Sequence, residues 1–259
     1  MLIPNKFKST KVWWDQFPYQ LKLITKIRFF ASFGAGGVLY LTSLIFNNIG
    51  LSATEIGLGF TISAIIGTLT RFITGNYLNK KGNILLPLII SSSFSVIASV
   101  LLIYSTNTFY YVIGQSFIGA AAGIYWPSVE ISIPYLCFPI ETRKAYALVR
   151  SSEALGIFLG VFIGTIFNSL SYLKYVYCND IVCMIIIVFI ILKNKTLLKA
   201  PINNQNLQEI RLKIKGKNKW HRDTPLIISS LVLINLKRSI KIEGSMIIGF
   251  GVPDLDFVL

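Results

Sequence analysis

The chain has 259 residues, of which 53% are hydrophobic and 14% are charged, and its formal net charge is +14. Soluble domains contain about 25% charged residues, so this composition excludes an ordinary soluble domain and favours a membrane protein. The Lys and Arg residues lie in loops between apolar runs, which is typical of a membrane orientation signal, and we expect no nucleic-acid partner.

Six apolar runs are long enough to cross a bilayer, which takes about 20 helical residues. Lipid cannot satisfy exposed backbone amides, so these runs are predicted to be helices. They cover approximately residues 23–46, 55–78, 84–104, 109–136, 146–170 and 172–192. The predicted fold class is therefore an all-α membrane protein, with a six-transmembrane-helix bundle over residues 23–192.

The basic residues are concentrated on one side of these runs. They lie in the segment through Arg28, in the turn at 80–81, in the region 143–150 and in the loop 193–223. The other side holds only Lys174. The positive-inside rule then places both the N-terminus and the basic loop in the cytoplasm. We expect an integral, multi-pass protein of the cell (inner) membrane.

The regions outside the bundle have different compositions. Residues 1–22 are predicted to be a cytoplasmic or interfacial segment, and residues 193–224 a basic cytoplasmic linker. An apolar run restarts at 225 but is followed by four charged residues within 237–243. Each costs about 2.5–3.5 kcal/mol at a helix centre. Residues 225–259 are therefore expected to be an incomplete seventh helix and an aberrant tail, as in a truncated protein.

Metal and enzyme chemistry have no support in the residue pattern. Cys137, Cys178 and Cys183 lack a metal-type pair spacing, and His221 is the only histidine. No Ser/His pair or paired-Asp motif lies in the predicted crossings. We expect no metal, no cofactor and no enzymatic activity.

Glu130 is the most specific candidate inside the fourth predicted helix. At about 100° per residue, it shares a face with Ser116, Gly119 and Gly123, so it is expected to face protein rather than lipid. An intramembrane carboxylate is a functional candidate by default, and a structural ion pair is the open alternative. Trp126, beside a proline, is expected to shape a cavity there.

Other charged residues lie in the second, fifth and sixth predicted helices. The Arg71 side chain either faces the interior of the bundle or extends to the membrane surface. Arg150 and Glu153 are three residues apart and are expected to pair with each other or with Glu130. Asp180 either faces the bundle about 12 Å below the outer surface or marks a helix end.

The fifth predicted helix carries a stripe of glycines. Gly156, Gly160 and Gly164 are four residues apart, which leaves one face without side chains. Such a stripe favours close helix packing, and a gliding surface for a moving bundle is the alternative.

Several of these stretches resemble signatures of the major facilitator superfamily. Residues 75–83 resemble the loop Gly-x-Leu-x-Asp-Arg-x-Gly-Arg/Lys between helices two and three. Gly75, Lys80 and Gly82 fit this pattern, whereas Asn79 and Asn83 replace the acidic residue and the second basic residue.

Two further stretches carry the resemblance. Residues 119–123 look like the small-residue core of helix four, with Gln115 where the family has an arginine. Residues 139–146 are similar to the stretch Pro-x-x-x-Arg-x-x-Ala/Gly that enters helix five, and Arg143 fits its arginine. The order and spacing of the motifs match the family over about residues 22–192.

The resemblance implies a secondary active transporter, or permease, that moves a small solute by alternating access between two six-helix halves, of which this chain supplies the N-terminal one. A non-transporting membrane remnant or a scaffold that requires a partner half is the alternative. The implied partners are the lipid bilayer, a solute with proton coupling through Glu130, and a homodimer or a missing second half. The implied substrate or coupling residues are Glu130, Gln115, Tyr125, Trp126 and Asp180. The implied gate or motif residues are Arg71, Gly75, Asn79, Lys80, Gly82, Arg143, Arg150 and Glu153. Close helix packing is expected at Gly119, Gly123, Gly156, Gly160 and Gly164.

Overall fold

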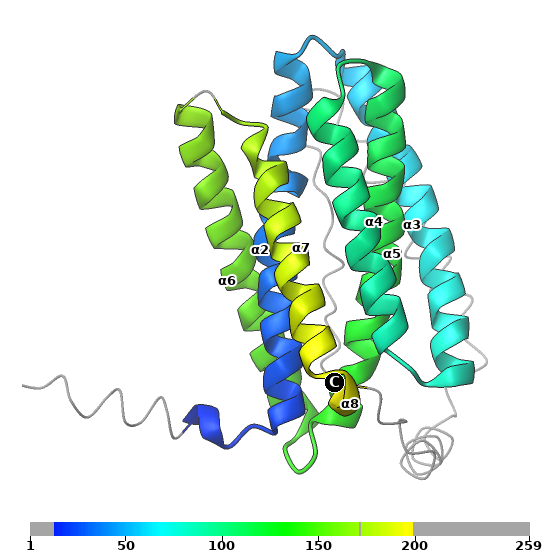
Figure 1. The fold of residues 1–259 in the computed structure, drawn as a ribbon, viewed down its shortest axis with the longest axis vertical. Coiled ribbons are helices and arrows are strands. Elements are labelled where there is room, and N and C mark those ends of the chain that lie inside the picture. The colour runs from blue at the N-terminus through cyan, green and yellow to red at the C-terminus, as the bar shows by residue number, and fades with distance from the viewer. Residues whose placement is uncertain (1–12, 171, 199–259) are drawn as a thin grey trace, which may run out of the picture. The chain divides into compact units, whose positions relative to one another are not determined.

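The computed structural model describes residues 13–170 and 172–198, and the long elements within these ranges are helices (Figure 1). The six long helices and one short one are α2 (Tyr19–Asn48), α3 (Ala53–Lys81), α4 (Leu85–Tyr104), α5 (Thr108–Leu136), α6 (Thr142–Ser169), α7 (Tyr175–Lys193) and α8 (Lys195–Leu198). The described part of the chain is thus an all-α bundle, as the sequence predicts.

The six predicted runs coincide with α2 to α7, with three differences at their ends. Helix α2 begins at Tyr19, inside the segment expected to precede the bundle, and α6 begins at Thr142 rather than near 146. Helix α7 begins at Tyr175 and continues through Asp180 without a break, so the expectation that Asp180 marks a helix end is wrong. The predicted tail at 225–259 and most of the predicted linker at 193–224 lie outside the described residues.

Five of these helices are long and apolar enough to cross a membrane: α2, α3, α4, α6 and α7. Helix α5 has 29 residues and is not among the five. It packs against α3 and α4 within the bundle (Figure 1). Its residue Gln115 is buried, and polar groups in membrane proteins are tolerated where they face protein.

The helices pack as two groups of three. Helix α2 packs against α6 and α7, while α5 packs against α3 and α4, and α4 contacts α7 between the groups. Exchanging α2 with α5, α3 with α6 and α4 with α7 maps the contacts of one group onto those of the other and the α4–α7 contact onto itself. Each helix lies three positions along the chain from its counterpart, so the two run in opposite directions across the bundle. This is the arrangement of an inverted three-helix repeat.

Glycines form the closest helix contacts within each group. A Cβ at Gly160 of α6 would collide with the backbone oxygen of Phe33 in α2, and one at Gly123 of α5 would collide with the backbone oxygen of Gly67 in α3. Side chains would meet similar obstacles at Gly119, Gly156 and Gly164. The stripes predicted from the sequence therefore lie at the α3–α5 and α2–α6 contacts, where missing side chains let backbones approach.

Specific polar contacts fix the loops at one end of the bundle. Ser52 caps α3 in a reciprocal capping box with Glu55, and the Thr108 hydroxyl at the start of α5 donates to the same carboxylate. The ammonium group of Lys174 donates to the backbone oxygens of Ile103, at 2.9 Å, and Ser105, at 3.2 Å. The link before α7 is thereby attached to the end of α4.

Gly82 ends α3 at the opposite end of the bundle. Its φ of 62° lies in the left-handed region, and its N–H donates to the backbone oxygen of Leu78. Glycine adopts this conformation without the steric cost that a side chain brings. The end of α3 therefore explains why a glycine occupies position 82 in the turn that resembles the family motif.

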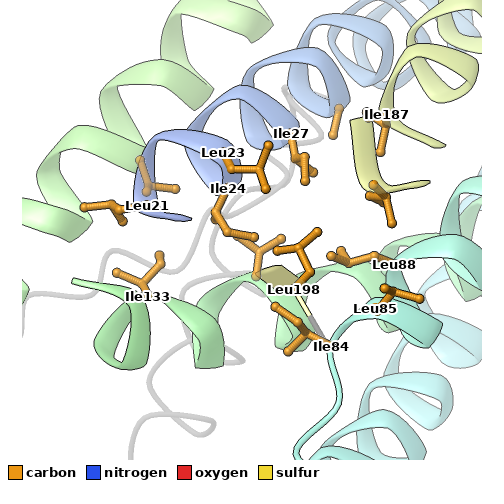
Figure 2. Close-up of a cluster of buried hydrophobic side chains, with 14 of the residues drawn as sticks. Leu21, Leu23, Ile24, Ile27, Ile84, Leu85, Leu88, Ile133, Ile187 and Leu198 are labelled. Carbon is orange, nitrogen blue, oxygen red and sulfur yellow. The ribbon is translucent and has the colours of Figure 1, made fainter. Parts of the chain in front are cut away.

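Two clusters of buried apolar side chains lie at different levels of the bundle. Figure 2 shows part of the first, which includes Leu21 and Ile24 of α2, Leu88 of α4, Ile133 of α5 and Ile187 of α7. The second includes Ile45 and Phe46 of α2 and Val176 and Tyr177 of α7, from the opposite halves of those two helices. The middle of the bundle lies between them.

Candidate functional site

A cavity of about 140 Å³ occupies the middle of the bundle. Five helices line it: α2, α4, α5, α6 and α7. Most of its lining is Ala, Val, Leu, Ile and Met, and the polar residues on it are Arg28, Ser32, Ser91, Ser95, Glu153, Asp180 and the aromatic pair Tyr125 and Trp126. A mostly apolar cavity with a few convergent polar groups is the usual form of a small-molecule site.

The position of the cavity follows from the order of lining residues along each helix. In α2 the lining runs from Arg28 to Leu39, between the apolar residues of the first cluster and those of the second. In α7 it runs from Asp180 to Met184, between Tyr177 and Ile187. The cavity is therefore separated from both ends of the bundle by packed apolar side chains.

An ion cluster borders the cavity through Arg28 and Glu153. Arg28 in α2 is 1% exposed, and its Nη2 lies 2.7 Å from Oε2 of Glu153 in α6 and 3.9 Å from Oε1 of Glu130 in α5. Arg150 in α6 reaches the same two carboxylates, with Nη2 2.9 Å from Glu130 and Nη1 3.1 Å from Glu153. Two cations and two anions thus balance where three helices meet.

Aromatic rings cover the buried arginine. The guanidinium carbon of Arg28 lies 3.6 Å from the Trp126 ring centroid and 5.6 Å from that of Tyr125. A desolvated cation–π contact contributes about 2 kcal/mol. Within the described residues, Arg28 Nε and Nη1 and the Tyr125 hydroxyl have no hydrogen-bond partner. This side of the cavity therefore presents unused donors beside aromatic faces.

Asp180 in α7 lies on another part of the cavity wall. Its side chain is buried, and its Oδ2 accepts hydrogen bonds from the hydroxyls of Ser95, at 2.9 Å, and Ser99, at 2.7 Å, both in α4. Its Oδ1 lies over Gly34 of α2, where an added Cβ would be 2.6 Å away. The carboxylate therefore joins α2, α4 and α7 in the middle of the bundle.

The structure brings six of the predicted residues to this region. Arg150 contacts both Glu153 and Glu130, the two partners expected for it. Tyr125, Trp126, Glu153 and Asp180 line the cavity. Glu130 is in an ion pair, and whether it also handles substrate or protons stays a prediction.

Other predicted residues lie elsewhere. Gln115 is buried in α5 but is not on the cavity wall. Arg71 and Arg143 are exposed and make no ion pair with any described residue. Asn79 and Lys80 are exposed at the end of α3, next to Gly82, and a Cβ at Gly75 would meet nothing within 4 Å. The gate and motif roles proposed for these residues remain predictions.

Sequence reasoning missed Arg28 of the ion cluster and the two serines that donate to Asp180, Ser95 and Ser99. Arg28 was counted among the charges that flank the first crossing, and this is wrong because the helix starts nine residues earlier, at Tyr19, which places Arg28 inside the bundle. Ser91, Ser95 and Ser99 are four residues apart in α4. That spacing puts three hydroxyls on one helix face, a signal that could have identified the polar wall opposite Asp180.

Comparison with known proteins gives one family and one fold. The model of the Major Facilitator Superfamily matches residues 27–247. Tetrameric PepTSo2 aligns with a TM-score of 0.61 and 13% identity, over 86% of this chain and 54% of its own. Two structures of a POT family transporter, one with a thioalcohol-conjugated peptide and one with 5-aminolevulinic acid, align with TM-scores of 0.61 and identities of 15% and 14%.

The coverage is unequal in these structural alignments. Each POT family structure is covered over 48% of its length, against 87% of this chain, so the chain spans about half the length of the solved structures that it matches. At these identities the likeness shows the fold alone. A search of curated proteins gave no match.

Proposed function

The chain belongs to the Major Facilitator Superfamily, and we propose that it acts as a secondary active transporter, a permease that moves a small solute by alternating access. The long apolar helices make it an integral, multi-pass membrane protein. The observation that supports the proposal is the cavity of about 140 Å³ in the middle of the bundle, with packed apolar side chains on both sides along the helices.

The helix grouping offers a mechanical basis for transport. The cavity wall includes α2, α6 and α7 from one three-helix group and α4 and α5 from the other. A second six-helix bundle that rocks against this one would open one apolar layer while the other stays packed, so that the solute exchanges with one side at a time. Inverted repeats in transporters provide this equivalence of the two sides.

The ion cluster is placed to act as a gate in this scheme. Arg28 and Arg150 connect α2 and α6 with Glu130 of α5, across the boundary between the groups. Separating these charges in a low-dielectric interior is costly, so the cluster holds that side closed until solute or a proton changes the balance. Proton coupling through Glu130 is part of this proposal, as are a cytoplasmic N-terminus and an inner-membrane location.

We further propose that transport requires a second six-helix bundle. The chain spans about half the length of the solved structures that it matches, and alternating access needs two bodies that rock about a site. Apolar side chains are exposed on α3, at Leu69 and Phe72, and on α6, at Phe158 and Phe162. A second copy or a separate second half would pack on such a face. Without either, the alternative is a non-transporting scaffold or remnant.

Solute flux through vesicles that contain the purified chain tests this proposal. The full chain is reconstituted with a panel of small neutral, cationic and anionic solutes, and counterflow is measured for each. We expect saturable flux of at least one solute. Ala122→Phe, which fills the cavity, should abolish that flux, whereas Ala64→Phe on the exposed surface of α3 should preserve it.

The oligomeric state in the same vesicles, measured by crosslinking, distinguishes a homodimer from an isolated bundle. Flux that is equal in the Ala122→Phe and Ala64→Phe chains would refute the cavity as the path. Absence of flux for every solute, in a folded chain, would favour the scaffold.

A further inference from the structure

We propose that Asp180, with Ser95 and Ser99, forms a cation subsite of the cavity that binds the ammonium group of a small apolar amine. The inference deepens the proposed transport function and rests on it for its biological meaning.

Asp180 is a buried carboxylate without a cationic partner among the described residues. It is 1% exposed and makes no ion pair with any described residue. Its partners are the hydroxyls of Ser95 and Ser99, which are neutral. An ionised carboxylate in an apolar interior is strongly disfavoured unless a cation or a proton neutralises it. The site therefore has affinity for positive charge.

The charged groups nearest to Asp180 are already used elsewhere. Arg28 lines the same cavity, but it lies six residues before Gly34 in α2, about 9 Å along the helix axis. It forms the 2.7 Å pair with Glu153, which is the other carboxylate that the described part of the chain places on the cavity wall. On α7, Tyr177 shares a hydrogen bond with Thr42, and Cys183 carries an uncharged thiol. None of these groups supplies the missing positive charge.

The geometry around the carboxylate leaves acceptors for an ammonium group. Both serine hydroxyls donate to Oδ2, so Oδ1 remains as an acceptor on the side of Gly34. The Ser95 hydroxyl, which lies on the cavity wall, also keeps lone pairs after donating its one hydrogen, whereas Ser99 supports the carboxylate from behind the wall. A primary ammonium carries three N–H donors and can use the carboxylate and the Ser95 hydroxyl oxygen together. The negative charge of Asp180 and the available hydrogen-bond acceptors therefore both favour a primary ammonium group.

The rest of the cavity fixes the body of the ligand. Its volume of about 140 Å³ is close to the roughly 150 Å³ of an engineered apolar cavity that holds benzene. The cavity wall also includes Ala35, Val38 and Ile118, which offer no hydrogen bonds from their side chains. The occupant is thus expected to have a ring-sized apolar body and one ammonium group.

Binding of three isosteric probes to the purified full chain in lipid nanodiscs tests the subsite. The probes are benzylammonium, benzyl alcohol and benzoate, at constant ionic strength, with affinity measured by calorimetry. We expect benzylammonium to bind at least about tenfold more tightly than benzyl alcohol, because a hydrogen bond to a charged group contributes more than a neutral one. Benzoate should not bind measurably.

Two variants locate the charge that is responsible. Asp180→Asn should weaken benzylammonium binding at least about tenfold and leave benzyl alcohol unchanged. Ser99→Ala keeps the carboxylate but removes one hydroxyl, and it should weaken benzylammonium several-fold, which decides the question if the Asp180→Asn chain does not fold. Asp15→Asn, at an exposed carboxylate before the bundle, is the matched control and should bind as the wild type does.

Equal binding of benzylammonium and benzyl alcohol, or full binding by folded Asp180→Asn, would overturn the proposal. If calorimetry detects binding of sodium chloride but not of potassium chloride, and benzylammonium does not bind, the subsite binds an inorganic cation. That outcome would also overturn the proposal. Binding needs no flux, so a chain that binds benzylammonium but transports nothing sustains the subsite and refutes the transport function. Flux of other solutes without this binding does the reverse.

Discussion

Glu153→Gln should destabilise the bundle strongly, because it removes a charge from the centre of the ion cluster. Glu153 lies 2.7 Å from Arg28 and 3.1 Å from Arg150, and its side chain is 11% exposed. Removing one partner of a buried pair costs about 3–5 kcal/mol, since the other charge stays buried without compensation. The lower value, about 3 kcal/mol, applies here because Glu130 remains 3.9 Å from Arg28.

The free energy of unfolding, measured by denaturant titration of the purified chain in mixed micelles, checks this value. Glu141→Gln is the matched control, because Glu141 pairs with Lys144 at 3.7 Å with side chains 69% and 68% exposed, and such a pair contributes about 1 kcal/mol or less. The double variant Arg28→Gln/Glu153→Gln should recover part of the loss, since it leaves the 2.9 Å Arg150–Glu130 pair balanced. A Glu153→Gln chain as stable as Glu141→Gln, or additive losses in the double variant, would refute the reasoning.

Three further predictions concern packing, capping and topology. Gly160→Ala should cost about 1–3 kcal/mol, because its Cβ meets the backbone of α2, whereas Gly75→Ala, in open space, should stabilise α3 by about 0.5–1 kcal/mol; thermal unfolding compares the two. Ser52→Ala should cost about 1 kcal/mol through loss of the capping box, measured in the same way, and a change within error would contradict the cap. In a background without the three native cysteines, a membrane-impermeant maleimide should label Lys80→Cys from the cytoplasm and Thr106→Cys from outside, and reversed labelling, or labelling of both cysteines from the same side, would refute the orientation.

Local patterns were sufficient to predict the helices and much of the ion cluster. Apolar runs of about 20 residues have few structures open to them in a bilayer, so α2 to α7 lie close to their predicted ranges. Arg150 and Glu153 are three residues apart on one helix, so their pairing follows from the helical period.

The remainder of the site depends on contacts between distant segments. Arg28 pairs with Glu153 across 125 positions of sequence, and no local pattern specifies which helix packs on which. The same holds for Asp180, whose hydroxyl partners lie in α4. Charge counting also assigned Arg28 to the membrane flank, because an arginine near a helix start usually belongs there.

The accessibility of the cavity from the two sides of the membrane tests the central claim most directly. A single cysteine at Ser91, on the cavity wall, is introduced into the background without native cysteines and exposed to an impermeant thiol reagent from each side in turn. Alternating access predicts modification from both sides, with a ratio that a bound solute shifts. Modification from one side only, unchanged by every solute of the panel, would contradict a transporter and leave the chain as a membrane scaffold.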